Sequence, residues 1–217
     1  PVAHSFPTRR SSDLLKTIAG EGGRFSERAA DMAMRCTDSA EAIQWFREMA
    51  HSPQTVRCAI VGAGALGDPS LVEDLLLLMG EEETSRVAGE AFAMITGVDI
   101  EYEDLDAEEP EGFQAGPSEE AEDEDVAMDP DEDLPWADPE LIRNWWYERR
   151  EHFNSGTRYI RGKEITVASL KDALIKGNQR QRAAAALELA IRNPTALLFE
   201  TRANGKRQLK LLEKWTS

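Results

Sequence analysis

Residues 56–69 read VRCAIVGAGALGDP, and this stretch decides the fold class. Starting at Val56, its apolar side chains recur at i, i+3, i+4 and i+7, the spacing of one face of a helix. Gly67 then supplies a helix stop, Asp68 caps the next helix, and Pro69 occupies its first position. The stretch therefore predicts two consecutive helices joined by a tight turn.

The same pattern occurs three times, each copy beginning with an arginine. Arg28, Arg57 and Arg86 are spaced 29 residues apart, and Arg182 begins a similar run further along the chain. Small residues follow the first three arginines at matching positions: Ala30, Ala59 and Ala88, and then Ala33, Gly62 and Ala91. Ala or Gly three positions apart lets neighbouring helices approach closely. We interpret the four arginines as structural residues of a helical repeat.

Outward from this stretch, the sequence predicts an all-α chain of antiparallel helix pairs. We expect helices at 26–36, 38–50, 54–66, 70–79, 84–96, 139–153, 167–176 and 180–192, a short extended piece at 157–165, and a basic amphipathic end at 206–215. Helices 26–36 and 38–50 are expected to form the first pair. The predicted units are repeats at 15–98, an acidic insert at 99–138 and a C-terminal helical unit with a further repeat at 139–217.

The acidic insert concentrates the negative charge of the chain. Between Asp99 and Glu140 there are twenty Asp and Glu residues and no Lys or Arg, out of 41 acidic residues in all. Its Pro, Gly and charge content predicts a long, largely irregular segment. We expect five apolar anchors to dock on the helical body (Phe113, Val126, Met128, Leu134 and Trp136). We expect the carboxylates to face solvent or the basic residues just downstream (Arg143, Arg149, Arg150, Arg158, Arg161 and Lys163).

The first fourteen residues have a different origin in this interpretation. His4–Leu14 reads HSFPTRRSSDL, which is the one-frame translation of a common sequencing-adapter oligonucleotide. We therefore interpret residues 1–14 as an artefact and expect them to make few buried contacts. The native beginning of the chain is then expected to be missing.

Several runs carry a resemblance to known proteins. They are LGDP at 66–69, AGEAF at 88–92, ITGVD at 95–99, DEDVAMDPDE at 123–132, LPW at 134–136, GTRY at 156–159 and QRQRAAAALE at 179–188. Residues 56–69 resemble the short HEAT-like repeats of phycobilisome lyases. The longer set resembles an uncharacterised bacterial HEAT-repeat family that is often encoded beside type VI secretion spike and adaptor genes. The resemblance implies a HEAT-like solenoid and an accessory or adaptor role for secreted effectors, and it carries over no catalytic residues.

Residues for catalysis or metal binding are few. Outside residues 1–14 the only histidines are His51 and His152, and Cys36 and Cys58 lack the spacing of a redox or metal site. Asp129, Asp131, Asp133 and Glu140 have the spacing of a calcium loop. However, Leu134 stands where that loop needs glycine, so we expect no metal or other cofactor.

A candidate surface for a protein partner lies in the region 136–150. Trp145, Trp146, Arg149, Arg150 and Trp136 are residue types found at interface hot spots. Because a helix cannot bury two adjacent tryptophans on one face, one should pack inward and the other should be covered by the insert or exposed. Two interpretations also remain open for the repeat arginines Arg57, Arg86 and Arg182. They could line a groove that binds an anionic ligand, or they could bond to carbonyls or carboxylates of the adjacent repeat.

These observations favour a non-catalytic protein-binding scaffold in a bacterial cytoplasm, with a secreted effector or spike component as its partner. A sequence pI near 4.7 argues against nucleic acid as the partner, and no apolar run approaches the length that spans a membrane. A chromophore-lyase-like enzyme and a structural repeat domain without a ligand remain the alternatives.

Overall fold

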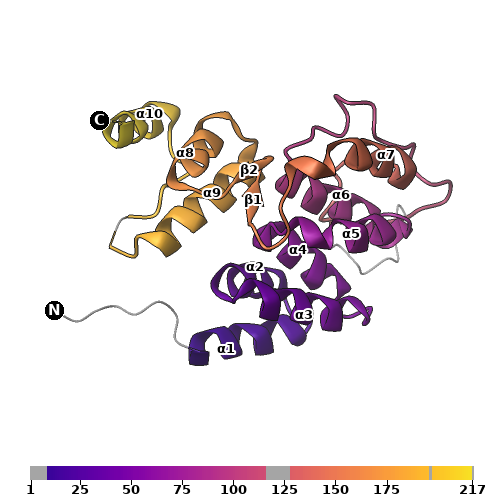
Figure 1. Ribbon diagram of the computed structural model, residues 1–217. Coiled ribbons are helices and arrows are strands. Elements are labelled where there is room, and N and C mark those ends of the chain that lie inside the picture. The colour runs from indigo at the N-terminus through magenta and orange to yellow at the C-terminus, as the bar shows by residue number, and fades with distance from the viewer. Residues whose placement is uncertain (1–8, 116–127, 196, 217) are drawn as a thin grey trace, which may run out of the picture.

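The computed structural model describes residues 9–115, 128–195 and 197–216 (Figure 1). The helices are α1 (Arg9–Gly20), α2 (Ser26–Cys36), α3 (Ser39–Ala50), α4 (Val56–Leu66), α5 (Val72–Leu78), α6 (Glu82–Thr96), α7 (Pro139–Arg149), α8 (Val167–Lys176), α9 (Gln179–Arg192) and α10 (Gly205–Thr216), with 3-10 turns η1 (Pro69–Leu71) and η2 (Arg150–His152). Two short antiparallel strands, β1 (Tyr159–Ile160) and β2 (Lys163–Glu164), form a hairpin. The all-α prediction is confirmed, and the helix bounds agree with the expected ones within a few residues.

Local capping chemistry explains why the bounds were predictable. The side chains of Asp38, Asp68 and Asp138 each accept a hydrogen bond from a backbone N–H in the first turn of the element that follows. Thr166 and Asn178 begin α8 and α9 with reciprocal capping boxes. Each cap satisfies a backbone donor that the helix itself leaves unpaired, so these residue types mark helix starts in the sequence.

Helices α2, α4 and α6 lie side by side, and α1, α3 and α5 pack on them in the same order. The expected pairing of residues 26–36 with 38–50 is wrong, because α3 makes its extensive contacts with α4. The backbone of Thr37 and Asp38 is extended between α2 and α3. This extended connection carries the chain away from α2 before α3 begins.

Small residues of α4 allow this close packing. A Cβ atom at Gly62 would lie 2.8 Å from Met34 Cγ on α2, and a Cβ atom at Gly64 would lie 3.1 Å from Ala91 Cα on α6. Helix α4 therefore has a glycine contact on each side. The prediction that Ala and Gly positions permit close helix approach is confirmed here.

The β hairpin closes the C-terminal ends of α4 and α6. The Tyr159 N–H donates to the carbonyl of Gly67 at 2.8 Å, and the Arg161 N–H donates to the carbonyl of Met94 at 2.9 Å. These bonds satisfy carbonyls at or near the helix ends, which otherwise have no partner within the helix. In Figure 1 the hairpin lies between the stacked helices and the α8–α10 unit.

The two ends of the acidic insert are ordered and pair with each other. The Ala107 N–H donates to the Trp136 carbonyl at 2.9 Å, and the Asp138 N–H donates to the Leu105 carbonyl at 3.0 Å. Ala137 packs on α6, where a Cβ atom at Gly89 would approach the Ala137 Cβ to 2.9 Å. The insert is thus joined to the helical stack at its base.

The side chains expected to anchor the insert differ in how deeply they are buried. Leu134 is buried, and Phe113 and Trp136 are half-buried against each other, with ring centroids 4.7 Å apart. Met128 is 67% exposed, so its assignment as an anchor is wrong. Val126 lies outside the described residues.

The N-terminal helix reaches into the segment interpreted as an artefact. Residues 1–8 lie outside the described part, whereas residues 9–14 form the first half of α1. Within that half, the side chains of Asp13 and Leu14 are exposed, and the buried residue Ala19 lies further along the helix. Residues 9–14 are thus helical, and none of the side chains described at positions 12–14 is buried.

Candidate functional site

A cavity of about 430 Å³ lies between the row α2, α4, α6 and helix α9. Apolar side chains from the row and from α9 line much of it (Val61, Ala65, Val87, Ala91, Met94 and Leu187). The insert contributes Asp131 and Leu134 to the wall. We call this cavity the groove, and its size is within the range of sites that hold small ligands or peptide side chains.

A second cavity of about 730 Å³ adjoins the groove. Both cavities are lined by Glu90 on α6, Leu134 in the insert and Arg180 on α9. Arg180 donates to Asp133 Oδ1 at 2.6 Å, so an exposed ion pair connects α9 to the insert at this junction. Exposed ion pairs of this kind contribute roughly 0–1 kcal/mol and break easily.

Two repeat arginines hold the insert beside the groove. Arg57 donates to both carboxylate oxygens of Asp131, at 2.5 and 2.7 Å, and also to Glu27 on α2 at 2.8 Å. The hydrogen bond to Asp131 is the main cause of a raised pKa for the Arg57 guanidinium, and burial opposes it. Arg86 donates to the Asp131 carbonyl at 3.0 Å and pairs with Asp129 at 2.7 Å.

The guanidinium of Arg86 also lies over two aromatic rings. Its Cζ is 4.6 Å from the Trp136 ring centroid and 5.3 Å from that of Phe113. Burial alone would raise the pKa of Asp129, but the Asp131 N–H and Arg86 outweigh it and lower that pKa. Asp129 and Asp131 therefore face Arg86 and Arg57, so the expectation that the carboxylates face solvent or the downstream basic stretch is wrong for these two. Asp133 is largely exposed to solvent, as expected, although it pairs with Arg180.

The other two repeat arginines have different surroundings. Arg28 is exposed and lines the groove in the first turn of α2. Arg182 donates to the Leu174 carbonyl at 2.9 Å and to the side chain of Gln208. Of these arginines, Arg57 bonds to the neighbouring repeat helix through Glu27, whereas Asp129 and Asp131, the partners of Arg86 and of Arg57, belong to the insert.

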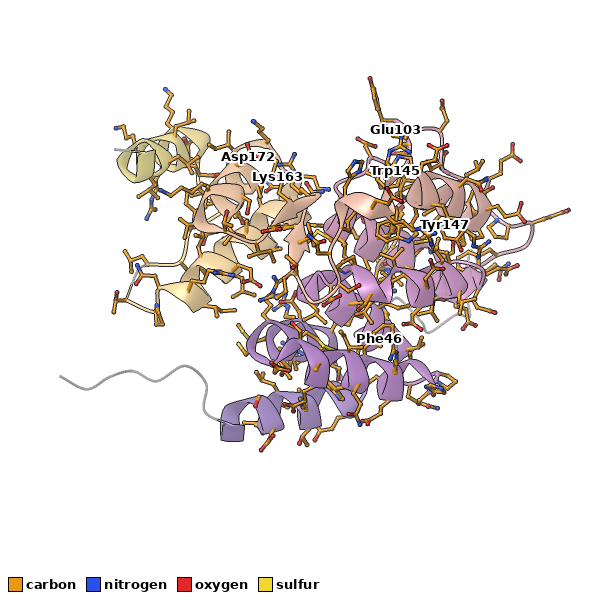
Figure 2. The ribbon with its side chains drawn as sticks, in the orientation of Figure 1. Phe46, Glu103, Trp145, Tyr147, Lys163 and Asp172 are labelled. Carbon is orange, nitrogen blue, oxygen red and sulfur yellow. The ribbon has the colours of Figure 1, made fainter. Side chains whose placement is uncertain are left out.

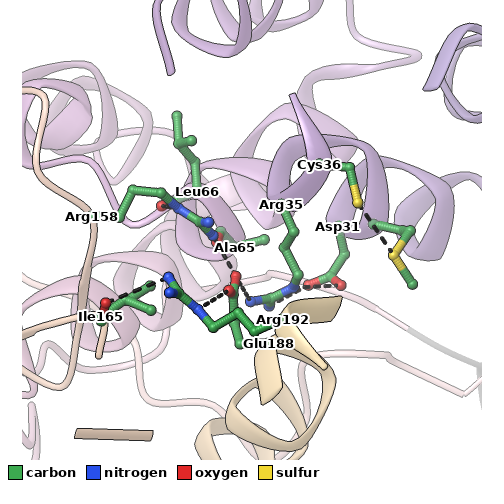
Figure 3. Close-up of polar contacts among 10 residues, drawn as sticks. Asp31, Arg35, Cys36, Ala65, Leu66, Arg158, Ile165, Glu188 and Arg192 are labelled. Carbon is green, nitrogen blue, oxygen red and sulfur yellow. Dashed lines mark hydrogen bonds and ion pairs between the residues drawn. The ribbon is translucent and has the colours of Figure 1, made fainter. Parts of the chain in front are cut away.

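A buried ion network joins the C-terminal unit to the stack (Figure 3). Glu188 of α9, whose side chain is 2% exposed, accepts from Arg35 of α2 at 3.1 Å and also from Arg158. Arg35 pairs in addition with Asp31 at 2.8 Å. Burial works against the charge of Arg35, but Asp31 and Glu188 outweigh it and raise its pKa. Since buried charges need such partners, this network fixes α9 as one wall of the groove.

Glu90 lacks the pairing that the other buried charges have. Its Oε1 atom is buried and has no hydrogen-bond partner among the described residues. Burial raises the pKa of Glu90 to about 7, with Arg180 opposing the shift and Asp133 adding to it. The sequence analysis did not identify Glu90, because a single Glu within a helix has the same local pattern whether it faces solvent or a cavity.

The tryptophans of α7 are directed into the protein. Trp146 is 5% exposed and contacts Phe92 edge to face, with ring centroids 6.2 Å apart. Trp145 is half-buried against the same Phe92 at 5.7 Å, and the Cζ atom of Arg149 lies 4.6 Å from its ring centroid. Trp146 is therefore not a surface residue, which corrects its assignment to a partner-binding patch.

What remains exposed on α7 is a smaller surface. Figure 2 labels Trp145 and Tyr147 on this helix. Tyr147 is 46% exposed and Arg150 lies 4.7 Å from its ring centroid. Trp136 does not belong to this surface, because it packs against Arg86 on α6.

The remaining candidate residues are those considered for metal binding and redox chemistry. No group of three or more His, Cys, Asp or Glu in the described part of the chain could hold a metal ion. Asp131, from the calcium-like spacing, is bonded to Arg57 and Arg86. Cys36 and Cys58 are free thiols, and burial raises the pKa of each.

Two further findings concern the similarity of this chain to known proteins and the length of its apolar helices. Searches of protein-family models, curated proteins and solved structures found no match to this chain. Across residues 9–115, 128–195 and 197–216, no helix has both the length and the apolar character needed to cross a membrane.

Proposed function

We propose that this chain is a HEAT-like helical repeat protein that acts as a non-catalytic scaffold and binds a protein partner in the groove. The observation that carries the proposal is the groove itself, an apolar-lined cavity between the row α2, α4, α6 and α9. The Glu188 network holds α9 in place, and the Arg57–Asp131 pair holds the insert in place. A site whose walls are fixed in this way can bind with little reorganisation.

The groove suits a protein segment because it offers both apolar and charged contacts. Its floor is apolar, while Arg28 and Glu27 stand among its charged lining residues. Interfaces between proteins combine an apolar centre with a polar rim. The resemblance to HEAT-repeat proteins encoded beside secretion genes supports a type VI secretion effector or spike component as the partner, and a cytoplasmic place of action.

A groove-filling substitution tests the proposal. Ala183 is an exposed residue of α9 that lines the groove, so Ala183→Trp should fill the cavity without disturbing the core. Ala168 is an exposed residue of α8 outside the groove, and Ala168→Trp is the matched control. We expect purified spike and effector proteins encoded beside the gene for this chain to bind the wild type and Ala168→Trp but to lose at least tenfold in affinity for Ala183→Trp.

The outcome also separates the alternatives. Equal binding by both tryptophan variants would exclude the groove as the partner site and leave the exposed part of α7 as the candidate. A purified chain that carries a coloured tetrapyrrole would favour the lyase-like enzyme instead.

A further inference from the structure

Glu90 is the feature of the groove that its structural role does not explain. Burying a carboxyl oxygen without a partner is unfavourable, and such groups persist where they have a use. The Oε1 atom of Glu90 is in this state, and the residue lines both the groove and the second cavity. Because a carboxyl group rotates about its Cγ–Cδ bond, a hydrogen-bond donor that enters the cavities can become the partner that this group lacks.

The charges around Glu90 decide which kind of donor fits. Arg180 on α9 is held by Asp133, Arg57 on α4 is held by Asp131 and Glu27, and Arg161 by the hairpin faces Asp172 at 3.6 Å. These cations from α4, α9 and the hairpin, and likewise Arg35 and Lys176, already have carboxylate partners. Arg28 of α2 also lines the groove, but the charges that act on Glu90 are those of Arg180 and Asp133. At Glu90 itself the unmatched group is therefore an acid, which favours a positively charged ligand.

The described part of the insert adds further negative charge near Glu90. Asp99, Glu101 and Asp133 line the second cavity and Asp131 lines the groove, and residues 99–138 contain no Lys or Arg. An apolar floor next to this carboxyl matches a side chain with an aliphatic stem and a cationic head. Lysine and arginine are the two side chains with that chemistry.

Resting on the proposed function, we propose that the groove recognises a basic segment of the protein partner, in which a lysine or arginine flanked by apolar residues places its cation on the buried carboxyl of Glu90. The flanking apolar side chains lie on the floor formed by Val61, Val87 and Ala91. The exposed Arg180–Asp133 pair at the junction opens to admit the segment.

This arrangement makes binding depend on pH in a defined direction. The arginines keep their charge between pH 6 and pH 8, so the ionisation of Glu90 itself controls the site. With the pKa of Glu90 at about 7, a cation binds best when the carboxyl is ionised, and affinity should rise roughly tenfold from pH 6 to pH 8. A neutral carbonyl bound by the protonated carboxyl would give the opposite slope.

Calorimetric titration of the full chain with two synthetic peptides tests the proposal. The basic probe is acetyl-Ala-Leu-Lys-Leu-Ala-amide, and the neutral probe replaces its lysine by norleucine. We expect Glu90→Gln to weaken the basic probe about a hundredfold at pH 8 and to abolish its pH dependence, because a hydrogen bond to a charged group is worth roughly 1.5–3 kcal/mol. Repeating the titration at pH 6 in phosphate and in imidazole buffer should show release of nearly one proton by the wild type and none by Glu90→Gln.

The controls keep the result interpretable. Glu83→Gln is the same change at an exposed site on the same helix and should bind like the wild type. The neutral probe should bind wild type and Glu90→Gln equally, which shows that the groove of the variant is intact. Unchanged binding of the basic probe by Glu90→Gln, tighter binding at pH 6 than at pH 8, or no binding of the basic probe to the wild type would each overturn the inference. The comparison of Ala183→Trp with Ala168→Trp tests the scaffold proposal separately.

Discussion

Asp131 and Asp133 are two residues apart in the acidic insert, but their surroundings differ sharply. The Asp131 side chain is 6% exposed and receives two hydrogen bonds from Arg57, whereas the Asp133 side chain is 74% exposed and pairs with Arg180. Charge-assisted bonds to a buried carboxylate stabilise a fold much more than an exposed pair does. Asp131 therefore holds the insert more firmly than Asp133 does, and residue type alone did not distinguish the two.

Substituting each of these acids in turn tests this difference. Asp131→Ala should lower the free energy of unfolding by about 2 kcal/mol, because Arg57 loses both of its hydrogen bonds to the Asp131 carboxylate. Asp133→Ala should change it by less than about 0.5 kcal/mol. Urea unfolding followed by circular dichroism measures both variants, and equal losses would show that the insert is not held through Asp131.

Glu90 gives a second prediction at the residue scale, which concerns pH. Its pKa is raised in the folded state to about 7 from 4.5, so folding favours the protonated form. Below pH 4.5 the carboxyl is protonated in both the folded and the unfolded state, so its ionisation does not affect the free energy of unfolding. As the pH rises from 4.5 to about 7, the unfolded state loses this proton before the folded state does, and the protein is increasingly destabilised. Above pH 7 the destabilisation is constant. Glu90→Gln should therefore raise the free energy of unfolding by about 1–3 kcal/mol at pH 8 and by clearly less at pH 5.

The measurement is urea unfolding at the two pH values. Glu83→Gln, an exposed site on the same helix, should show no such dependence. A stabilisation by Glu90→Gln that is the same at pH 5 and pH 8 would contradict the burial of the carboxyl.

At the scale of elements, the sequence predicted what local chemistry determines. Asp68 with Pro69, Asp138 with Pro139, and Gly67 marked helix ends because caps and stops act within a few residues. The pairing of helices was not predictable in the same way. Whether α3 packs on α2 or on α4 depends on the path of a two-residue connection, which hydrophobic spacing does not encode.

The contact of the hairpin with α4 gives a prediction for these elements. Gly67 has φ +74°, and a Cβ atom there would lie 2.2 Å from the Tyr159 carbonyl oxygen. Gly112 has a similar φ of +84°, but a Cβ atom there would have no other atom within 4 Å. An alanine at Gly112 therefore measures the cost of the backbone conformation without a steric clash. Gly112→Ala should cost about 1 kcal/mol, and Gly67→Ala should cost at least about 2 kcal/mol more because the hairpin must move. Thermal unfolding measures the loss of stability of both variants. Equal losses would show that the hairpin does not pack closely against the end of α4.

At the scale of the whole molecule, the groove is made by contacts that are distant in sequence. Arg35 bonds to Glu188, which is 153 residues away in the sequence, and Arg57 bonds to Asp131, which is 74 residues away. Periodicity and motifs describe segments of about ten residues, so they predicted helices and small-residue contacts but not this cavity. They also placed partner binding on the α7 tryptophans, one of which the fold buries against Phe92.

The central claim is that a partner binds in the groove rather than on α7. Site-specific photo-crosslinking tests it most directly, with benzoylphenylalanine replacing either Arg28, whose long, exposed side chain lines the groove, or Tyr147, which is exposed on α7. With a purified type VI effector or spike protein as the partner, the account predicts a covalent adduct from position 28 and none from position 147. An adduct from position 147 without one from position 28 would contradict it.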